Sequence, residues 1–375
     1  MSGYGWTKEL GARVAGSRHL DRSKVQAPGV IRDPSGGYRL FYTAVGPGKP
    51  FPACQGYILS AHSHDGLSFT PDPGIRGAPD PEVTFGSLRL LAPTLTALPD
   101  GQWRMYFESR GPADAPTVIR SAISSDLLEW AFEDGIRLSG YDGTGGPSYV
   151  ELPDGRGRLY CFASEFDEGG LAGGNRISQC VISAVTTDGL NFDLEPGYRL
   201  TDRYSQIEDL GITAADVILP ERDGGLWTMV YSGWQDVPPG TEVPPHPSSD
   251  PNAVESGLSA DFVAASIAAD LAGYRSRIFT ATSSDGLNWE RDRCVIEGGG
   301  HDSDDIDAVH AEDMSVIRLD DGRYRMYYAA CDRHGNWTVA AVYMNVKNHH
   351  KSRSWYAKWY HTISLRCAGG SPTAP

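Results

Sequence analysis

The stretch Ser283-Ser284-Asp285-Gly286-Leu287-Asn288-Trp289 is one of four nearly identical short phrases in the chain. The other copies begin at Ser63, Ser124 and Thr186, and they keep its Asp, its Leu and its final aromatic residue. We call these four segments the turn phrases. Recurrence along most of the chain indicates a repeated structural unit, and such a repeat decides the fold before any single site does.

Each repeat also contains a strand that alternates aromatic with small or polar residues, such as Trp103–Phe107 or Tyr324–Tyr328. An apolar strand and a turn rich in Asp, Pro and Gly come before it, and a third strand separates it from the turn phrase. A unit is therefore a meander of four strands. Five such units predict an all-β fold, a five-bladed β-propeller with four-stranded antiparallel blades around a central axial pocket.

We expect one propeller domain over residues 1–345 and a basic, aromatic tail over 346–375. The last unit lacks a turn phrase, so we expect the segment around Trp6 to supply its outer strand and close the ring. The proline-rich stretch 236–257 is either a lid or a mobile insertion. The predicted blades cover about 24–75, 90–138, 145–200, 212–297 and 312–345.

The formal charge of −15 argues against a nucleic-acid partner, because phosphate contacts need a basic face. It favours a neutral or cationic ligand or a metal ion. No apolar run is long enough to span a membrane, and Met1–Arg18 lacks the layout of a signal peptide, so we expect a cytoplasmic protein. The oligomeric state is left open.

The aspartates of the turn phrases have a structural role in this interpretation. In an Asp-Gly turn the carboxylate accepts backbone N–H groups while Gly takes the positive φ angle. The aromatic residue that follows is expected to pack between blades. The aspartates concerned are Asp65, Asp126, Asp188 and Asp285.

Candidate catalytic residues lie where the inner strands begin, since these starts converge on the axis. Glu312 and His310 come directly before the last inner strand, and each is either a functional group or a buried strut. Strand alternation sends both of them to one side and Asp313 to the other. For Asp216 and Asp142, a buried brace and a pocket acid with a shifted pKa are both open.

Further residues are expected to contact the substrate. Trp234 either stacks on a sugar or packs in the core. Glu108 and Glu165 end aromatic strands, and we expect these ends to lie away from the pocket rim. The predicted substrate contacts are Gln26, Asp313, Trp234, Ser148 and Asp209.

The acidic run before the last inner strand includes Asp302, Asp304 and Asp305, which we interpret as a solvated loop. A structural calcium ion on the axis is possible, because calcium favours clustered carboxylate oxygens, although the spacing is not that of an EF-hand. No other cofactor is expected.

The aromatic strands and Ser-x-Asp-Gly-Leu-x-Trp turns resemble those of the five-bladed propeller superfamily of glycoside hydrolases. That superfamily includes family 43, the invertase-like families and the mannoside phosphorylases, and the resemblance covers about residues 20–345. It implies three carboxylates at inner-strand starts. The sequence departs from that pattern, with Ala27 and Gly146 where Asp is implied and Thr213 near the place of the Glu.

Three functions remain open. The first is a glycoside hydrolase-like enzyme acting on a sugar or glycosylated small molecule, with Glu312 and Asp216 as the acid pair and His310 assisting. The second is a biosynthetic enzyme on the same fold that cyclises, dehydrates or isomerises a small metabolite. The third is a carbohydrate- or ligand-binding propeller without catalysis.

Overall fold

The structure is a computed structural model that describes residues 5–22, 24–45, 55–112, 115–166, 176–202, 208, 211–222, 224–236, 240 and 274–344. Within these residues the only helical element is a short 3-10 turn, η1 (Thr84–Gly86). The strands form three hydrogen-bonded sheets of eight, five and eight strands. The prediction of an all-β fold is therefore confirmed.

The strands follow one another as antiparallel meanders. The first meander contains β2 (Lys24–Arg32), β3 (Tyr38–Val45), β4 (Gly56–Ser63) and β5 (Thr70–Pro71). The second contains β6 (Arg89–Ala97), β7 (Trp103–Arg110), β8 (Val118–Ser124) and β9 (Ala131–Phe132). The third contains β10 (Gly143–Glu151), β11 (Gly157–Phe166), β12 (Arg176–Thr186), β13 (Asp193–Leu194) and β14 (Leu200–Thr201).

The fourth meander contains β15 (Gly211–Ile218), β16 (Trp227–Asp236), β17 (Tyr274–Ser283) and β18 (Glu290–Ile296). The last contains β19 (His310–Arg318), β20 (Tyr324–Cys331), β21 (Trp337–Met344) and, from the start of the chain, β1 (Trp6–Val14). Of the proline-rich stretch only residues 236 and 240 are described, and the tail 346–375 lies outside the described residues.

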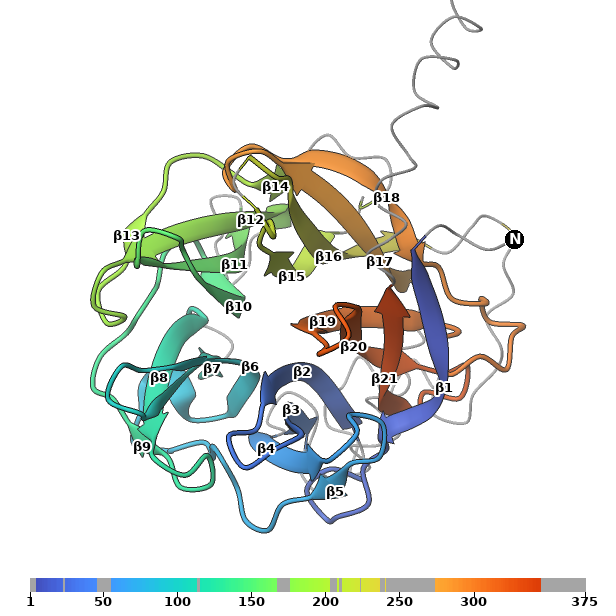
Figure 1. Cartoon of the computed structure of the whole chain (residues 1–375), viewed down its shortest axis with the longest axis horizontal. Helices are drawn as coiled ribbons and strands as arrows, with labels where there is room; N and C mark the ends of the chain where they lie inside the picture. The colour runs from blue at the N-terminus through green and yellow to red at the C-terminus, as the bar shows by residue number, and fades with distance from the viewer. Residues whose placement is uncertain are drawn as a thin grey trace, which may run out of the picture.

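The meanders surround a common centre (Figure 1). The strands nearest to it are β2, β6, β10, β15 and β19; each contacts the next, and β19 contacts β2. Single parallel bridges, Gly56 with Arg89 and Ser276 with His310, join neighbouring meanders into larger sheets. Because the sheets run on across the expected boundaries, the blade count and the blade limits stay predictions.

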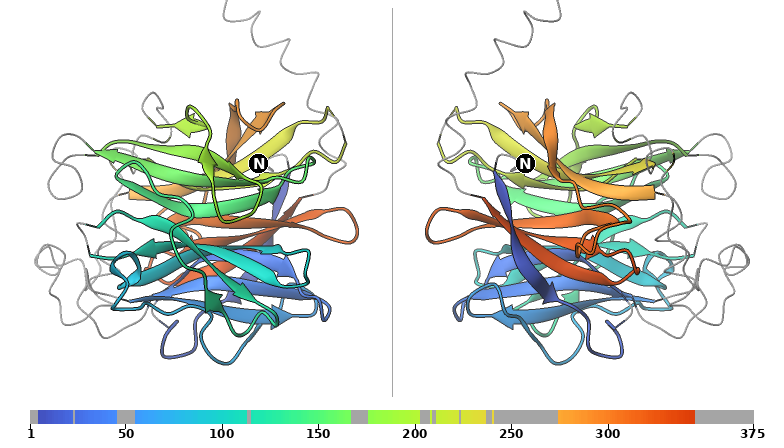
Figure 2. Two further views of the ribbon diagram at one scale, coloured as in Figure 1. Left: turned by 90° about the vertical axis from the view of Figure 1, so that its left-hand side faces the viewer. Right: turned by 90° about the vertical axis from the view of Figure 1, so that its right-hand side faces the viewer.

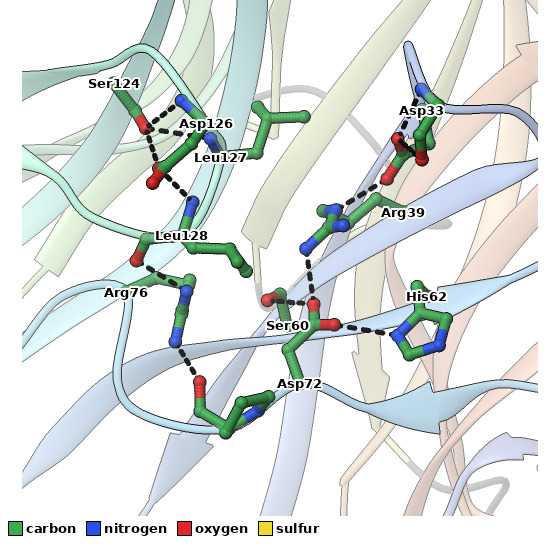
Figure 3. Close-up of polar contacts among 12 residues, drawn as sticks. Asp33, Arg39, Ser60, His62, Asp72, Arg76, Ser124, Asp126, Leu127 and Leu128 are labelled. Carbon is green, nitrogen blue, oxygen red and sulfur yellow. Dashed lines mark hydrogen bonds and ion pairs between the residues drawn. The ribbon is translucent and has the colours of Figure 1, made fainter.

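The turn phrases connect neighbouring meanders. Asp126 Oδ1 accepts the backbone N–H group of Leu128 at 2.8 Å (Figure 3) and that of Glu129, also at 2.8 Å. The other three copies make the same pair of bonds, and in the first copy they lower the pKa of Asp65 to about 2. Arg76 from the first meander donates to the Leu128 carbonyl (Figure 3). The prediction that these aspartates are turn scaffold is confirmed.

The aromatic strands receive these turns. Tyr160 in β11 donates its hydroxyl to the Gly286 carbonyl at 2.8 Å, and Trp289 packs edge-on against its ring at 6.1 Å. Tyr327 in β20 makes the same contacts with the first turn phrase, through Gly66 at 2.7 Å and Phe69 at 5.7 Å. The contacts thus link the last meander to the first. The aromatic residues of the phrases pack between neighbours, as predicted.

Strand β1 lies at the outer side of the last meander (Figure 2) and pairs antiparallel with β21. Glu9 forms an ion pair of 2.9 Å with Arg325 in β20. The outer segments of the second and third meanders hold the matching arginines in the same way, through Arg104–Glu133 at 2.8 Å and Arg158–Glu195 at 2.7 Å. Strand β1 therefore takes the place of an outer strand.

The hydrophobic core is divided among the interfaces between neighbouring meanders. One cluster joins Phe41 of β3 to Leu90, Met105 and Phe107 of the second meander, all at most 1% exposed. Another joins Leu40 and Tyr42 of the first meander to Tyr327 of the last. Burial of such side chains contributes roughly 1.5–3 kcal/mol each. The packing fixes the meanders around the centre, where the inner strands begin.

Candidate active site

Every inner strand carries an irregularity near its start. The pairing with the neighbouring strand shifts after Gln26 in β2, Leu91 in β6, Gly145 in β10, Ile212 in β15 and Glu312 in β19. Such bulges redirect a side chain and are frequent beside active sites. At four starts a residue in the bulge has a positive φ: Ala27 at 44°, Ala92 at 49°, Gly146 at 54° and Asp313 at 49°.

These bulges surround a central cavity of about 40 Å3, which is enough space for a few water molecules. Its lining is dominated by small residues, including Ala27, Ala92, Gly146 and Ala214. Asp216 and Asp313 are the carboxyl groups among the lining residues. Of the four bulge residues with a positive φ, Asp313 is the one with an acidic side chain. An aspartate with φ near +50° is uncommon, and such strained residues concentrate at functional sites.

The Asp313 carboxyl is half-buried at the cavity and lies among negatively charged groups. Burial raises the pKa of Asp313 well above its ordinary value, and the nearby Glu312 and Glu108 carboxylates raise it further, against the opposite effect of Lys24 and Arg110. The Asp313 N–H donates to Ser232 Oγ at 2.9 Å, which fixes the backbone. A carboxyl group that keeps its proton in this way can act as a general acid.

Glu312 is 7% exposed, and both of its carboxylate oxygens accept hydrogen bonds. Trp234 Nε1 donates to Oε2 at 3.0 Å, and Gln26 Nε2 donates to Oε1 at 3.5 Å. Two donors and no acceptor suit the ionised form. Strands β2, β16 and β19 thus bring together Gln26, Trp234, Glu312 and Asp313, which the sequence singled out separately.

Glu108 is a site residue that the sequence analysis missed. Its Oε2 accepts the Gly146 N–H at 2.9 Å, its Oε1 accepts Arg110 Nε at 2.5 Å, and it is 3% exposed. The expectation that this strand end lies away from the pocket rim is wrong, because antiparallel pairing places Glu108 opposite Leu91 at the start of β6.

A signal for Glu108 was present in the Gly145-Gly146 pair. A Cβ atom on Gly145 would lie 2.2 Å from Glu108 Oε2, so this position has room for the carboxylate only without a side chain. The start of the third inner strand has Gly146 in place of an acid, and the Glu108 carboxylate of the second meander binds there instead. This relationship is not visible from the sequence spacing alone.

Asp216 and Ser148 belong to a set of contacts between inner strands. Asp216 Oδ1 accepts the Ser148 hydroxyl at 2.7 Å, and its Oδ2 accepts the Val316 N–H at 2.7 Å. Two similar hydrogen bonds join other neighbouring inner strands. The Ser315 hydroxyl accepts the Val30 N–H, and the Thr94 hydroxyl accepts the Tyr149 N–H. Burial raises the pKa of Asp216. Both carboxylate oxygens of Asp216 accept hydrogen bonds from neighbouring inner strands, which favours a buried brace over a pocket acid.

His310 does not face the axis, and this part of the prediction is wrong. The side chain is fully buried, its Nδ1 accepts the Ser276 N–H at 3.1 Å, and its ring stacks on Trp337 at 5.4 Å. A ring nitrogen that accepts a backbone N–H is unprotonated, so this imidazole is a neutral strut. The alternation argument did not take into account that β17 lies beside the start of β19, where Ser276 pairs with His310 and binds its ring.

Asp142 also binds backbone: its Oδ2 accepts the Phe166 N–H at 2.7 Å and so caps the end of β11. Asp209 lies outside the described residues. In the acidic run, Asp302, Asp304 and Asp305 are exposed, as expected of a solvated loop. No group of three His, Cys, Asp or Glu side chains in the described ranges could hold a metal ion, so the axial calcium ion stays an untested prediction.

No protein-family model matches the chain, and no curated protein matches its sequence. Across the residues that the structure describes, no helix has the length and apolar character needed to cross a membrane.

Several solved structures match nearly the whole chain. One described as a glycoside hydrolase matches with a TM-score of 0.62 at 14% identity, over 90% of this chain and 92% of its own. A β-1,2-mannobiose phosphorylase from Listeria innocua, in complex with β-1,2-mannobiose, matches with a TM-score of 0.59 at 13% identity, over 88% and 93%. A thermostable family-43 glycoside hydrolase matches with a TM-score of 0.56 at 13% identity, over 88% and 92%.

At these identities the likeness concerns the fold. The chain has a β-propeller fold of the kind found in glycoside hydrolases, which supports the resemblance drawn from the aromatic strands and turn phrases. A shared fold does not carry a shared reaction, so function is argued from the site.

Proposed function

We propose that this protein is a five-bladed propeller enzyme that hydrolyses a glycoside by acid–base catalysis at the centre of the ring. Asp313 is the proton donor, Glu312 is the base, and Glu108 is a positioning residue that helps to keep Asp313 protonated. This assignment replaces the Glu312–Asp216 pair and His310, whose oxygens and nitrogen are committed to structural hydrogen bonds.

In the proposed reaction Asp313 gives its proton to the glycosidic oxygen as the bond from that oxygen to the anomeric carbon breaks. Glu312 takes a proton from a water molecule, whose oxygen forms the new bond to the anomeric carbon. Two carboxyl groups in different environments divide these roles at one pH. The products are a free sugar, which is a hemiacetal, and an alcohol, and the proton lost by Asp313 is restored from Glu312 through solvent.

One observation carries this proposal: a carboxyl with a raised pKa lies beside a carboxylate held by two hydrogen-bond donors, at the convergence of the inner strands. Perturbed pairs of this kind are typical of catalytic sites. The fold of the solved glycoside hydrolases and phosphorylases is compatible with a sugar substrate.

The proposal is tested with a panel of aryl glycosides whose leaving groups differ in pKa. Asp313→Asn should slow substrates with poor leaving groups by about 10²–10⁴-fold and spare those with good ones, because good leaving groups need no proton. Glu312→Gln should slow both kinds. Asp302→Asn, in an exposed loop, is the matched control. Equal losses for Asp313→Asn on all leaving groups would exclude the donor role.

A second candidate is proton-transfer chemistry on a small metabolite, either isomerisation, cyclisation or dehydration. The small residues Ala27, Ala92 and Gly146 in the bulges favour it, because they leave one acid there in place of several. An enzyme of this class releases no sugar and exchanges a substrate C–H with solvent, which mass spectrometry in D2O detects. Binding without either reaction would indicate the third possibility, a ligand-binding propeller.

A further inference from the structure

Three inner strands are preceded by a buried acid that binds a tyrosine of the following strand. In the last meander this acid is Asp307, which stands three positions before β19 and is fully buried. Its Oδ2 accepts the Tyr328 hydroxyl at 2.9 Å. Tyr328 in β20 pairs with Met314, the residue that follows the bulge at Glu312 and Asp313. The hydrogen bond therefore joins the chain before this bulge to the strand beside it.

The same arrangement occurs in the fourth and first meanders. Glu208, three positions before β15, accepts the Tyr231 hydroxyl at 2.5 Å. Asp21, three positions before β2, accepts the Tyr42 hydroxyl at 2.8 Å. Tyr231 pairs with Ala215 directly after the β15 bulge, and Tyr42 lies opposite the β2 bulge. We call these three acid–tyrosine pairs the tyrosine clamps.

Each clamp is held together by charge. The three acids are at most 2% exposed, and each is paired with a cation near the surface, through Lys8–Asp307 at 2.6 Å, Arg291–Glu208 at 3.2 Å and Arg18–Asp21 at 3.1 Å. Burial and the Asp307 carboxylate raise the pKa of Tyr328, so its hydroxyl keeps its proton and donates. Hydrogen bonds to a buried carboxylate are strong and directional, so they fix both partners.

The clamps are found in the meanders that supply the proposed site. Gln26, Trp234 and Glu312, which contact one another, come from the first, fourth and last meanders. The inner strands β15, β19 and β2 of these meanders follow one another around the centre (Figure 1). Opposite the bulges of β6 and β10, the position of the tyrosine is taken by Phe107 and Cys161, which have no hydroxyl.

We propose that Tyr328 and Asp307 are positioning residues of the catalytic centre, which hold the β19 bulge so that Asp313 and Glu312 keep their relative places. This inference rests on the proposed function of the same site. Asp313 has a φ of 49°, a conformation that persists only where the surroundings enforce it. The Asp313 N–H is fixed by Ser232 Oγ, and the clamp fixes the chain on both sides of the bulge. Through Lys8, strand β1 takes part in this support.

The test compares Tyr328→Phe, which removes one hydroxyl, with the matched control Tyr160→Phe. Tyr160 is also buried, but its hydroxyl binds the Gly286 carbonyl of a turn phrase. The carboxyl groups are titrated by NMR in protein labelled with 13C at the aspartate carboxyl, and the Asp313 signal is the one missing from Asp313→Asn. A loosened bulge hydrates the carboxyl, so Tyr328→Phe should lower the pKa of Asp313 by about one unit, while Tyr160→Phe leaves it unchanged.

An unshifted Asp313 signal in Tyr328→Phe would overturn the proposal. An equal shift in Tyr160→Phe would overturn it as well, because any loosening of the fold would then be sufficient. If Tyr328→Phe does not fold, Lys8→Met takes its place, since this side chain is 42% exposed and its loss leaves the core intact. Lys8→Met should shift the signal in the same direction, and no shift would count against the clamp.

Turnover of aryl glycosides separates this proposal from the proposed function. Tyr328→Phe should lower kcat/KM for poor leaving groups by about tenfold or more, and Tyr160→Phe should leave it nearly unchanged. A shifted Asp313 signal in a protein that hydrolyses no glycoside keeps the clamp and removes the function. Hydrolysis that depends on Asp313 and is unaffected by Tyr328→Phe keeps the function and removes the clamp.

Discussion

The indole N–H of Trp234 in β16 donates a hydrogen bond of 3.0 Å to the carboxylate of Glu312 in β19. The two residues are 78 positions apart in the sequence, and each comes from a different meander. The contact holds the carboxylate beside Asp313. Trp234 is therefore placed to stabilise the charged form of the proposed base.

Trp234→Phe removes this donor and keeps most of the ring. Hydrogen bonds to charged groups contribute about 1.5–3 kcal/mol, so kcat/KM should fall by about 10–100-fold. Because the indole binds the proposed base and not the proposed acid, the loss should be similar for substrates with good and with poor leaving groups. A loss confined to poor leaving groups would contradict the role of Trp234, whatever its size.

Asp313→Asn should stabilise the protein at neutral pH. A carboxyl whose pKa is raised on folding contributes stability that is complete below its unfolded pKa, near 3.8, and is lost as the pH rises toward the folded value. Asn copies the neutral form at every pH. The melting temperature of the variant should match that of the natural protein at about pH 3.5 and exceed it increasingly above about pH 4. A constant difference across this range would rule out the raised pKa.

Asp216→Ala should act on stability and leave the reaction intact. It removes the acceptor of the Ser148 hydroxyl and the Val316 N–H, which should cost about 2–4 kcal/mol in the free energy of unfolding. The folded Asp216→Ala variant should have a kcat/KM within about threefold of that of the unaltered protein, and the same pH–rate profile. If activity falls a thousandfold in a protein that is still folded, Asp216 is a pocket acid after all.

Glu9→Gln should loosen β1. Arg325 is 5% exposed and would lose its carboxylate partner, at a cost of about 2–4 kcal/mol measured by urea unfolding. Glu133→Gln breaks the matching pair with Arg104 and should cost a similar amount. Glu82→Gln, at an exposed position, is the control. A negligible effect of Glu9→Gln beside a large effect of Glu133→Gln would show that β1 is no true counterpart of the outer strands.

Residues that act within one turn were predictable from the sequence. The Asp126 carboxylate accepts the N–H groups two and three positions later, so the groups that bind it are close neighbours in the sequence. Gln26, Trp234 and Glu312 were also predicted as candidates, because each stands near the end of a predicted strand, and their role in a site stays a prediction. Their mutual contact was not predictable, since it joins three meanders.

The errors concern contacts between strands that are distant in the sequence. The prediction for His310 relied on strand alternation, which does not show that Ser276 of β17 lies beside the start of β19 and binds the imidazole. Glu108 was assigned to the wrong end because strand pairing, rather than strand order, decides which ends are neighbours. For Asp216 the sequence left a brace and a pocket acid open; the residue lines the cavity, and its two acceptor bonds to β10 and β19 favour the brace.

By itself the sequence determined the all-β character, the repeated unit and the role of the turn aspartates, because these depend on residues a few positions apart. The tertiary structure decided which acids share a site. Hydrogen bonds between distant strands hold Asp216 and His310 and bring Glu108 to the Gly146 bulge, and burial beside Glu312 raises the pKa of Asp313. The charge state of a buried group is set by neighbours in space, and the repeat alone does not contain them.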